Sequence, residues 1–71
     1  MFKYTIIIEK LESNYSAYCP DLPGCIATGQ TEEETIQRMK EAIEFHIEGL
    51  REEKRSIPAP STKAVSVEVT V

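Results

Sequence analysis

The N-terminal part of the chain alternates between hydrophobic and polar positions in a way that predicts three short β-strands. In residues 2–10, alternate side chains share one face, and the β-branched isoleucines favour extended backbone. A polar reversal over residues 11–14 follows, and residues 15–19 alternate again, as in the returning arm of an antiparallel hairpin. Residues 25–29 supply a third strand. We therefore expect a three-stranded antiparallel meander.

The link between the second and third predicted strands contains two prolines and a glycine. Pro20 and Pro23 each fix φ at about −65° and lack an amide donor, whereas Gly24 can adopt positive φ without a steric penalty. These residue types predict a rigid, tight turn. Cys19 and Cys25 flank it with a spacing that matches no common metal motif, so we expect two small buried or turn residues without a disulfide.

An amphipathic helix is predicted over residues 32–54. Thr31 is a favoured N-cap, and Glu34 three residues later completes a capping box. Pro58 and Pro60 prevent the helix from continuing. Hydrophobic residues recur within it at steps of three and four and form one apolar stripe, namely Ile36, Met39, Ile43, Ile47 and Leu50.

The C-terminal residues 64–71 alternate most regularly, with valine at every second position and serine, glutamate or threonine between. This pattern predicts a strand with one hydrophobic face, reached from the helix through a proline-containing connector over residues 56–63. The predicted order is β-β-β-α-β, an α+β fold with one helix packed on one face of the sheet. A right-handed crossover would place the last strand parallel to the first, in the spatial order 3-2-1-4. The second face of the sheet, where Ile7 stands among polar residues, can then be open to water.

Length and composition indicate one small domain over residues 1–71. A chain of 71 residues buries only roughly 60% of the surface of its unfolded form, so we expect self-association into a dimer or tetramer. Hydrophobic residues make up 41% of the chain, yet no run approaches the ~20 apolar residues of a membrane-spanning helix. Because the N-terminus shows no secretory signal, a cytoplasmic location is expected.

The formal net charge of −4 argues against general affinity for nucleic acid, because such binding rests on many Lys and Arg contacts to phosphate. A basic protein suits this chain better as a partner. The sequence also offers no cofactor or metal site, since zinc would need about four ligands and His46 is the only histidine. We expect His46 to be structural, at the margin between helix and sheet.

One aromatic residue falls outside the apolar stripe of the predicted helix. Phe45 lies roughly 180° from Ile36 on the helical wheel, and Glu41, Glu44 and Glu48 surround it. One interpretation is a solvated face, with Phe45 covered by the connector or by a second subunit. The other is an acidic ridge with an aromatic centre that docks a basic protein by electrostatic complementarity.

Several short motifs carry a family resemblance across nearly the whole chain. They are Tyr15 to Ala17, Pro20-Asp21-Leu22-Pro23-Gly24-Cys25, Gly29-Gln30-Thr31, Glu41-Ala42-Ile43, His46-Ile47 and Ile57-Pro58-Ala59-Pro60. In residue type and order they resemble the HicB antitoxin family. Members of that family neutralise a small basic ribonuclease, the HicA toxin, by binding over its active surface. Their N-terminal domain has a truncated ribonuclease-H-like fold.

The resemblance implies an inhibitory binding protein, not an enzyme, with a HicA-type toxin as its partner. The tip formed by Asp21, Leu22, Pro23 and Gly24 becomes a candidate docking element, because a pre-organised loop loses little entropy on binding. Many members of the family also carry a C-terminal DNA-binding domain. The chain stops at Val71, so we expect no such domain and no direct DNA binding.

Two other functions stay open. The chain could be an orphan, homo-oligomeric binding module with no cognate toxin. A ribonuclease-H-like nuclease would need several carboxylates converging on metals about 4 Å apart. Glu9 and Glu68 could lie on adjacent strands, but no aspartate stands in any predicted strand, so the nuclease is the weaker alternative.

Overall fold

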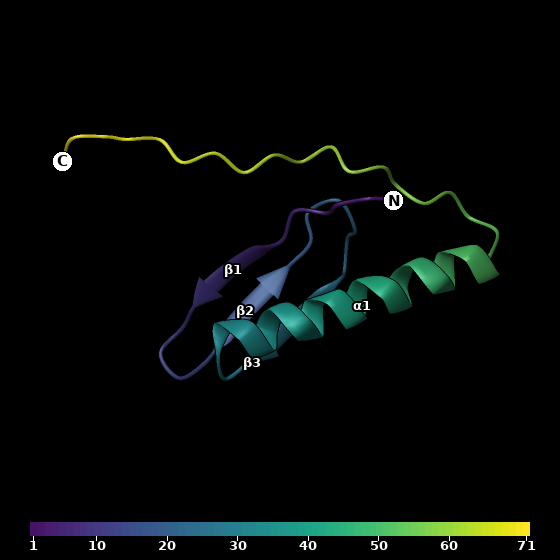
Figure 1. Cartoon of the computed structure of the whole chain (residues 1–71), viewed down its shortest axis with the longest axis horizontal. Helices are drawn as coiled ribbons and strands as arrows, with labels where there is room; N and C mark the ends of the chain where they lie inside the picture. Colours follow the sequence, from purple (N-terminus) through teal and green to yellow (C-terminus); the bar gives the residue numbers. More distant parts are fainter.

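The computed structural model describes all 71 residues and contains three strands and one helix. The strands are β1 (Ile7–Lys10), β2 (Tyr15–Tyr18) and β3 (Ile26–Gly29), and the helix is α1 (Glu32–Glu52). The strands pair antiparallel in the order β1-β2-β3. Figure 1 shows α1 running along one side of this sheet. The predicted α+β meander with a single covering helix is therefore confirmed.

The proline turn between β2 and β3 is as tight as its residue types predict. The backbone N–H of Leu22 donates to the carbonyl of Cys19, and the N–H of Cys25 donates to the carbonyl of Leu22, both at 3.1 Å. Gly24 adopts the positive φ of 84° that the turn requires. Directly beyond the turn Tyr18 pairs with Ile26. The turn thus sets the register of the second hairpin.

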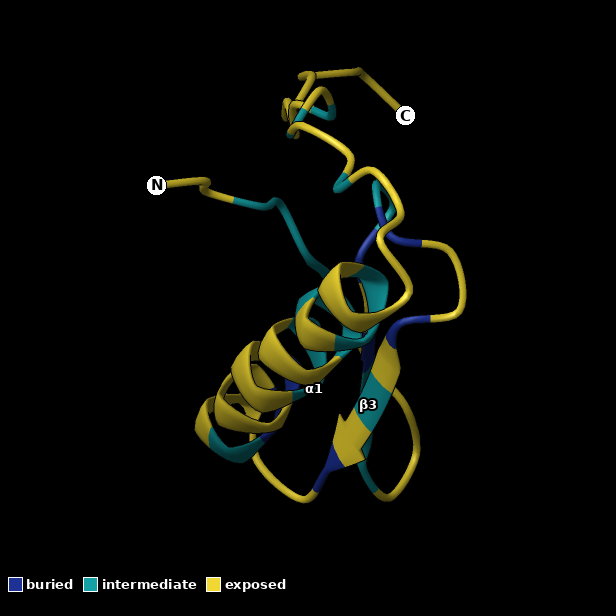
Figure 2. Ribbon diagram, turned by 90° about the vertical axis from the view of Figure 1, so that its right-hand side faces the viewer, coloured by how far each residue is buried: buried dark blue, intermediate teal, exposed yellow.

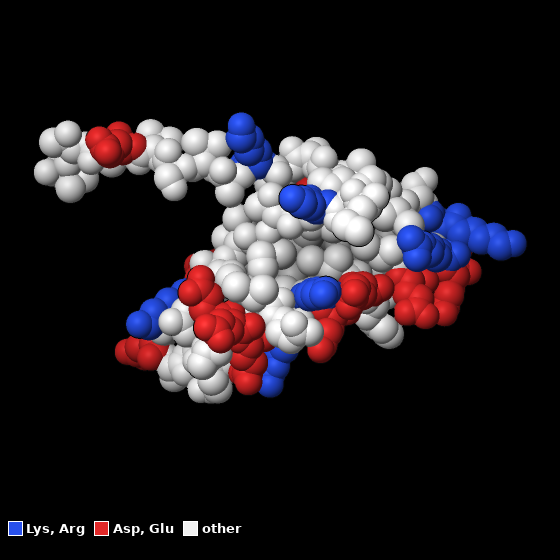
Figure 3. All heavy atoms as spheres, viewed as in Figure 1, with Lys and Arg blue, Asp and Glu red and all other residues white.

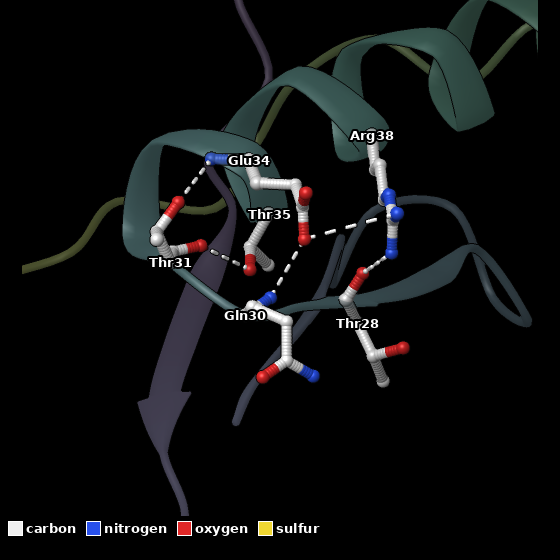
Figure 4. A network of polar contacts seen from close by, with 6 residues as sticks. All are labelled: Thr28, Gln30, Thr31, Glu34, Thr35 and Arg38. Atoms are coloured by element: carbon white, nitrogen blue, oxygen red, sulfur yellow. Dashed lines mark hydrogen bonds and ion pairs between the residues drawn. The ribbon is translucent and has the colours of Figure 1, made fainter. Parts of the chain in front are cut away.

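Polar contacts fix the N-terminus of α1 and tie it to β3 (Figure 4). The Thr31 hydroxyl accepts a hydrogen bond from the N–H of Glu34 at 3.0 Å, and the Glu34 carboxylate accepts one from the N–H of Gln30 at 2.7 Å. The Glu34 carboxylate thus binds the N–H of the residue before the N-cap instead of the N–H of the N-cap itself, which is a variant of the predicted capping box. Arg38 on the next turn donates to the carbonyl of Thr28 at 2.9 Å. The start of α1 is therefore well determined.

The C-terminus of α1 lies two residues before the predicted end. Lys54 has a left-handed φ of 57°, which stops the helical path. The N–H of Arg55 donates to the carbonyl of Leu50 at 2.8 Å and that of Lys54 to the carbonyl of Arg51 at 3.0 Å. These bonds satisfy carbonyls at the helix end, so the helix ends before the connector prolines.

The core lies between α1 and the sheet (Figure 2). Seven of the 71 residues are buried, so the core of a single chain is small. Met39 is fully buried at the centre of the predicted apolar stripe, but Ile36 on the same stripe remains 45% exposed. The buried hydrophobic residues are Ala17, Cys19, Leu22, Cys25 and Met39. One chain alone therefore leaves part of the hydrophobic face of α1 uncovered.

The predicted fourth strand is not formed within the single chain. Residues 64–71 pair with no strand, and the sheet has the order β1-β2-β3 instead of 3-2-1-4. The connector is held beside the N-terminal segment, where Tyr4 donates to the carbonyl of Pro58 at 2.5 Å and Thr5 donates to the carbonyl of Thr62 at 3.0 Å. Beyond that point the chain leaves the sheet (Figure 1). The alternating pattern of residues 64–71 predicts an extended conformation. Pairing also requires that the segment run beside an open strand edge, and in the single chain it does not.

Candidate functional site

A hollow of about 720 Å³ lies beside the proline turn. Pro23 and Gly24 border it on one side, and Phe45 and the half-buried His46 of α1 border it on the other. Phe45 is 80% exposed, and Ile26 at the start of β3 is 68% exposed. Two large hydrophobic side chains are thus open to solvent next to a rigid loop. That combination is typical of surfaces that bind another protein.

The helix carries the net charge of the molecule. It contains seven glutamates and three basic residues, a balance of −4 that equals the formal charge of the whole chain. Figure 3 shows red carboxylate groups gathered along the helix side of the molecule. Glu41, Glu44 and Glu48 are exposed, as is Phe45 among them. We call these four residues the helix ridge. The connector therefore does not cover Phe45 in the single chain, whereas a contact with a partner stays a prediction.

A row of hydrophobic side chains crosses the sheet on the face opposite α1. Ile7 pairs with Tyr18, and Tyr18 pairs with Ile26, so the three side chains point to the same face. This face is the outer one, because the neighbouring Ala17 points into the core and successive side chains alternate. Tyr18 is 42% exposed. We predicted Ile7 on this face among polar residues, and the register adds Tyr18 and Ile26 beside it, which alternation within each strand does not reveal.

The tip of the proline turn divides into an anchored part and an open part. Leu22 is completely buried and belongs to the core, so it fixes the turn and offers no surface to a partner in this conformation. Pro23 and Gly24 are exposed. Of the four candidate docking residues at the tip, these two keep a free surface, and Asp21 has a different task.

Asp21 fastens the connector to the turn. Its carboxylate accepts hydrogen bonds from the backbone N–H groups of Ser61 and Thr62 at 3.1 and 3.2 Å. It also accepts hydrogen bonds from their hydroxyls at 3.0 and 2.9 Å. The Thr62 hydroxyl, followed by the Ser61 amide, holds the pKa of Asp21 below its ordinary value of 3.8, because these donors favour the charged form. Asp21 is therefore a structural clamp at the border of the candidate site.

The two cysteines are buried and free, as the sequence predicts for small core residues. Burial, and then the neighbouring Cys19, raise the pKa of the Cys25 thiol, which leaves it protonated and unreactive near neutral pH.

No group of three or more histidine, cysteine or acidic side chains is placed to hold a metal ion. Within one chain residues 64–71 are unpaired, so Glu68 does not lie on a strand next to the Glu9 of the same chain. No helix is long and apolar enough to cross a membrane.

Comparisons with known proteins agree on one family. The family described as HicB_like antitoxin of bacterial toxin-antitoxin system matches residues 4–69. A UPF0150 protein of Synechocystis sp. is 46% identical over 59 residues, which cover 82% of this chain and 75% of that protein. A UPF0150 protein of Thermoplasma acidophilum is 39% identical over 66 residues, or 92% of this chain and 96% of that protein. No solved structure matches.

One similar protein carries a functional name. The protein named antitoxin HicB 2 of Photorhabdus laumondii is 31% identical over 61 residues. The match covers 86% of this chain but 44% of that protein. The family match includes all three strands, the proline turn and the whole of α1. The chain therefore belongs to the HicB-like antitoxin family of bacterial toxin–antitoxin systems.

Proposed function

We propose that this protein is an antitoxin that neutralises a small basic ribonuclease of the HicA type by direct binding in the cytoplasm. Family membership supports an antitoxin role in general. The observation that carries the specific proposal is the helix ridge, in which Phe45 is 80% exposed among three exposed glutamates. A basic protein is the partner that such a surface complements.

Two neighbouring features extend the proposed contact surface beyond the ridge. Pro23 and Gly24 present a loop whose backbone is already fixed, so its ordering on binding requires little entropy. Ile26, directly after the turn, adds a second exposed hydrophobic side chain, which points to the sheet face opposite α1. Phe45 is the anchor, because aromatic residues near the centre of an interface contribute most of its energy. The glutamates steer the basic partner and fix its orientation.

Inhibition in this proposal requires no chemistry from the antitoxin. Occupying the active surface of a ribonuclease excludes its RNA substrate. The proposed inhibition therefore uses neither a metal ion nor the carboxylates of Glu9 and Glu68. We accordingly propose a non-enzymatic inhibitor that binds no DNA through this domain, consistent with its acidic charge.

Co-expression tests this proposal directly. The chain is produced together with a HicA-type toxin, sought as a small basic protein encoded by a neighbouring gene, and both co-purification and rescue of growth are scored. Wild type should co-purify and restore growth, and Phe45→Ala should weaken both effects. Leu11→Ala, which removes another exposed hydrophobic side chain in the link between β1 and β2, outside α1, is the control and should behave as wild type. Failure of wild type in both assays would leave the orphan binding module as the better account.

A further inference from the structure

The C-terminal segment of the chain is a strand without a partner. Val65, Val67 and Val69 are 70%, 78% and 74% exposed, although they occupy one face of a regularly alternating segment. The hydrogen bonds that hold the connector to the protomer end at Thr62. Figure 1 shows residues 64–71 extending well away from the body of the molecule. A hydrophobic strand face is thus left in solvent.

The single chain exposes much more surface than a compact protein of its mass. A folded monomer of 8.0 kDa is expected to expose about 4,500 Å², whereas this chain exposes 5900 Å². Its radius of gyration is 13.8 Å, against about 11 Å for a compact domain of this length. The excess surface exceeds the roughly 800 Å² that each partner buries in a standard interface. The excess exposed area of the extended chain is therefore large enough for an interface with a second copy.

The same protomer has an apolar hollow beside the segment that leads into β1. A hollow of about 630 Å³ lies between α1 and the N-terminal segment that leads into β1, and nine of its twelve lining residues are hydrophobic. Tyr4 and Ile6 border it from the N-terminal segment, and Ile36, Ile43 and Ile47 border it from α1. We call this hollow the β1 groove. Beside it β1 is an edge strand, because its only neighbour is β2. An open edge next to an apolar groove is what strand addition requires.

We propose that two copies of this chain form a dimer by exchanging residues 64–71. Each copy adds this segment as a strand beside β1 of the other, with the valines directed into the β1 groove and the alternating Ser66, Glu68 and Thr70 directed to solvent. The exchange completes a four-stranded sheet in each half, with the strand order 3-2-1-4. It also covers the part of the helix stripe that remains exposed in one chain. Because each copy both donates and receives a strand, the assembly closes with two-fold symmetry.

The path of the connector explains why residues 64–71 pair with β1 of the other copy and not with β1 of their own chain. Thr62 is fixed by Thr5 and by the Asp21 clamp, and the chain diverges from its own β1 immediately beyond. When two copies exchange residues 64–71, the contacts of Thr62 within each copy are kept. The unpaired segment and the open edge of β1 then both gain a partner. The proposal concerns self-association alone, so it does not depend on the proposed toxin.

Paired substitutions on the two faces of the segment test the exchange. Molar mass is measured by light scattering during gel filtration. Wild type and Ser66→Glu/Thr70→Glu should have twice the 8.0 kDa mass of one chain, whereas Val67→Glu/Val69→Glu should run as a monomer. The four sites are exposed in the protomer, so the helical circular dichroism signal should persist in both variants. A monomeric wild type, or a dimer that withstands the valine substitutions, would overturn the proposal.

Mixing two defective chains distinguishes strand exchange from pairing of two tails with each other. Ile36→Glu places a charge in the β1 groove at a half-exposed position, and this variant should also be monomeric. Mixed with Val67→Glu/Val69→Glu, it contributes an intact tail that fits the intact groove of the other chain. Mixed dimers should then form, with an affinity below that of wild type. A mixture that stays entirely monomeric would contradict the proposed pairing of tail and groove.

Discussion

Gly29 at the end of β3 and Thr35 in the first turn of α1 approach so closely that no side chain fits between them. A Cβ atom added at Gly29 would lie 2.5 Å from Oγ1 of Thr35 and 2.9 Å from its backbone nitrogen. Thr35 is completely buried, and its hydroxyl donates to the carbonyl of Thr31 at 2.8 Å. The passage from sheet to helix therefore depends on a glycine at this position, for packing and not for an unusual φ.

Gly29→Ala should destabilise the fold by about 1–3 kcal/mol, because the added methyl group displaces the first turn of α1. Gly49→Ala is the matched control, since nothing lies within 4 Å of the added Cβ atom. Within a helix that change should stabilise by about 0.5–1 kcal/mol. Urea denaturation at a fixed protein concentration measures both free energies. Equal effects of the two alanines would contradict the close approach.

The Asp21 clamp should make stability depend on pH in the acid range. Its pKa is lowered below 3.8 in the folded state, so its stabilising effect is complete above that value and is lost as pH falls through the lowered pKa. Wild type should therefore lose more stability than Asp21→Asn between about pH 6 and about pH 3. Urea midpoints across this range provide the measurement, with Glu9→Gln as the exposed control. Parallel pH profiles for wild type and Asp21→Asn would show that the clamp is not formed.

The two cysteines should resist modification while the protein is folded. Both are buried, and the pKa of Cys25 is raised, so Ellman's reagent should react at least about tenfold more slowly than with a free thiol. Unfolding in urea should release two thiols per chain at the normal rate. Rapid reaction of both cysteines without denaturant would mean that the core around the proline turn opens readily.

Much of this fold could be predicted because its signals are local. Thr31 and Glu34 mark the helix start, Pro23 and Gly24 mark the turn, and alternation marks the strands. Each depends on neighbours within a few residues. Phe45 was identifiable as an exposed residue from helical geometry alone.

What the sequence could not provide depends on contacts between distant residues. The row containing Tyr18 and Ile26 follows from strand register, and the role of Asp21 as a clamp follows from the path of the connector. The burial of Leu22 inside an apparently exposed tip requires the turn to fold over the core. The alternating C-terminal residues indicate a strand but not whose sheet it joins, because alternation determines which face is hydrophobic and not which edge is the partner.

The measurement that tests the proposed antitoxin function most directly is the dissociation constant between this protein and the basic toxin, determined by calorimetry at about 0.15 M salt. Three proteins are compared: wild type, Glu44→Lys/Glu48→Lys on the helix ridge, and Glu9→Lys/Glu12→Lys, which makes the same charge change elsewhere. The ridge variant should bind at least about tenfold more weakly, a loss of about 1.4 kcal/mol. The control should stay within about threefold of wild type. Equal affinities for wild type and the ridge variant, or an equal loss in both variants, would contradict docking at the ridge.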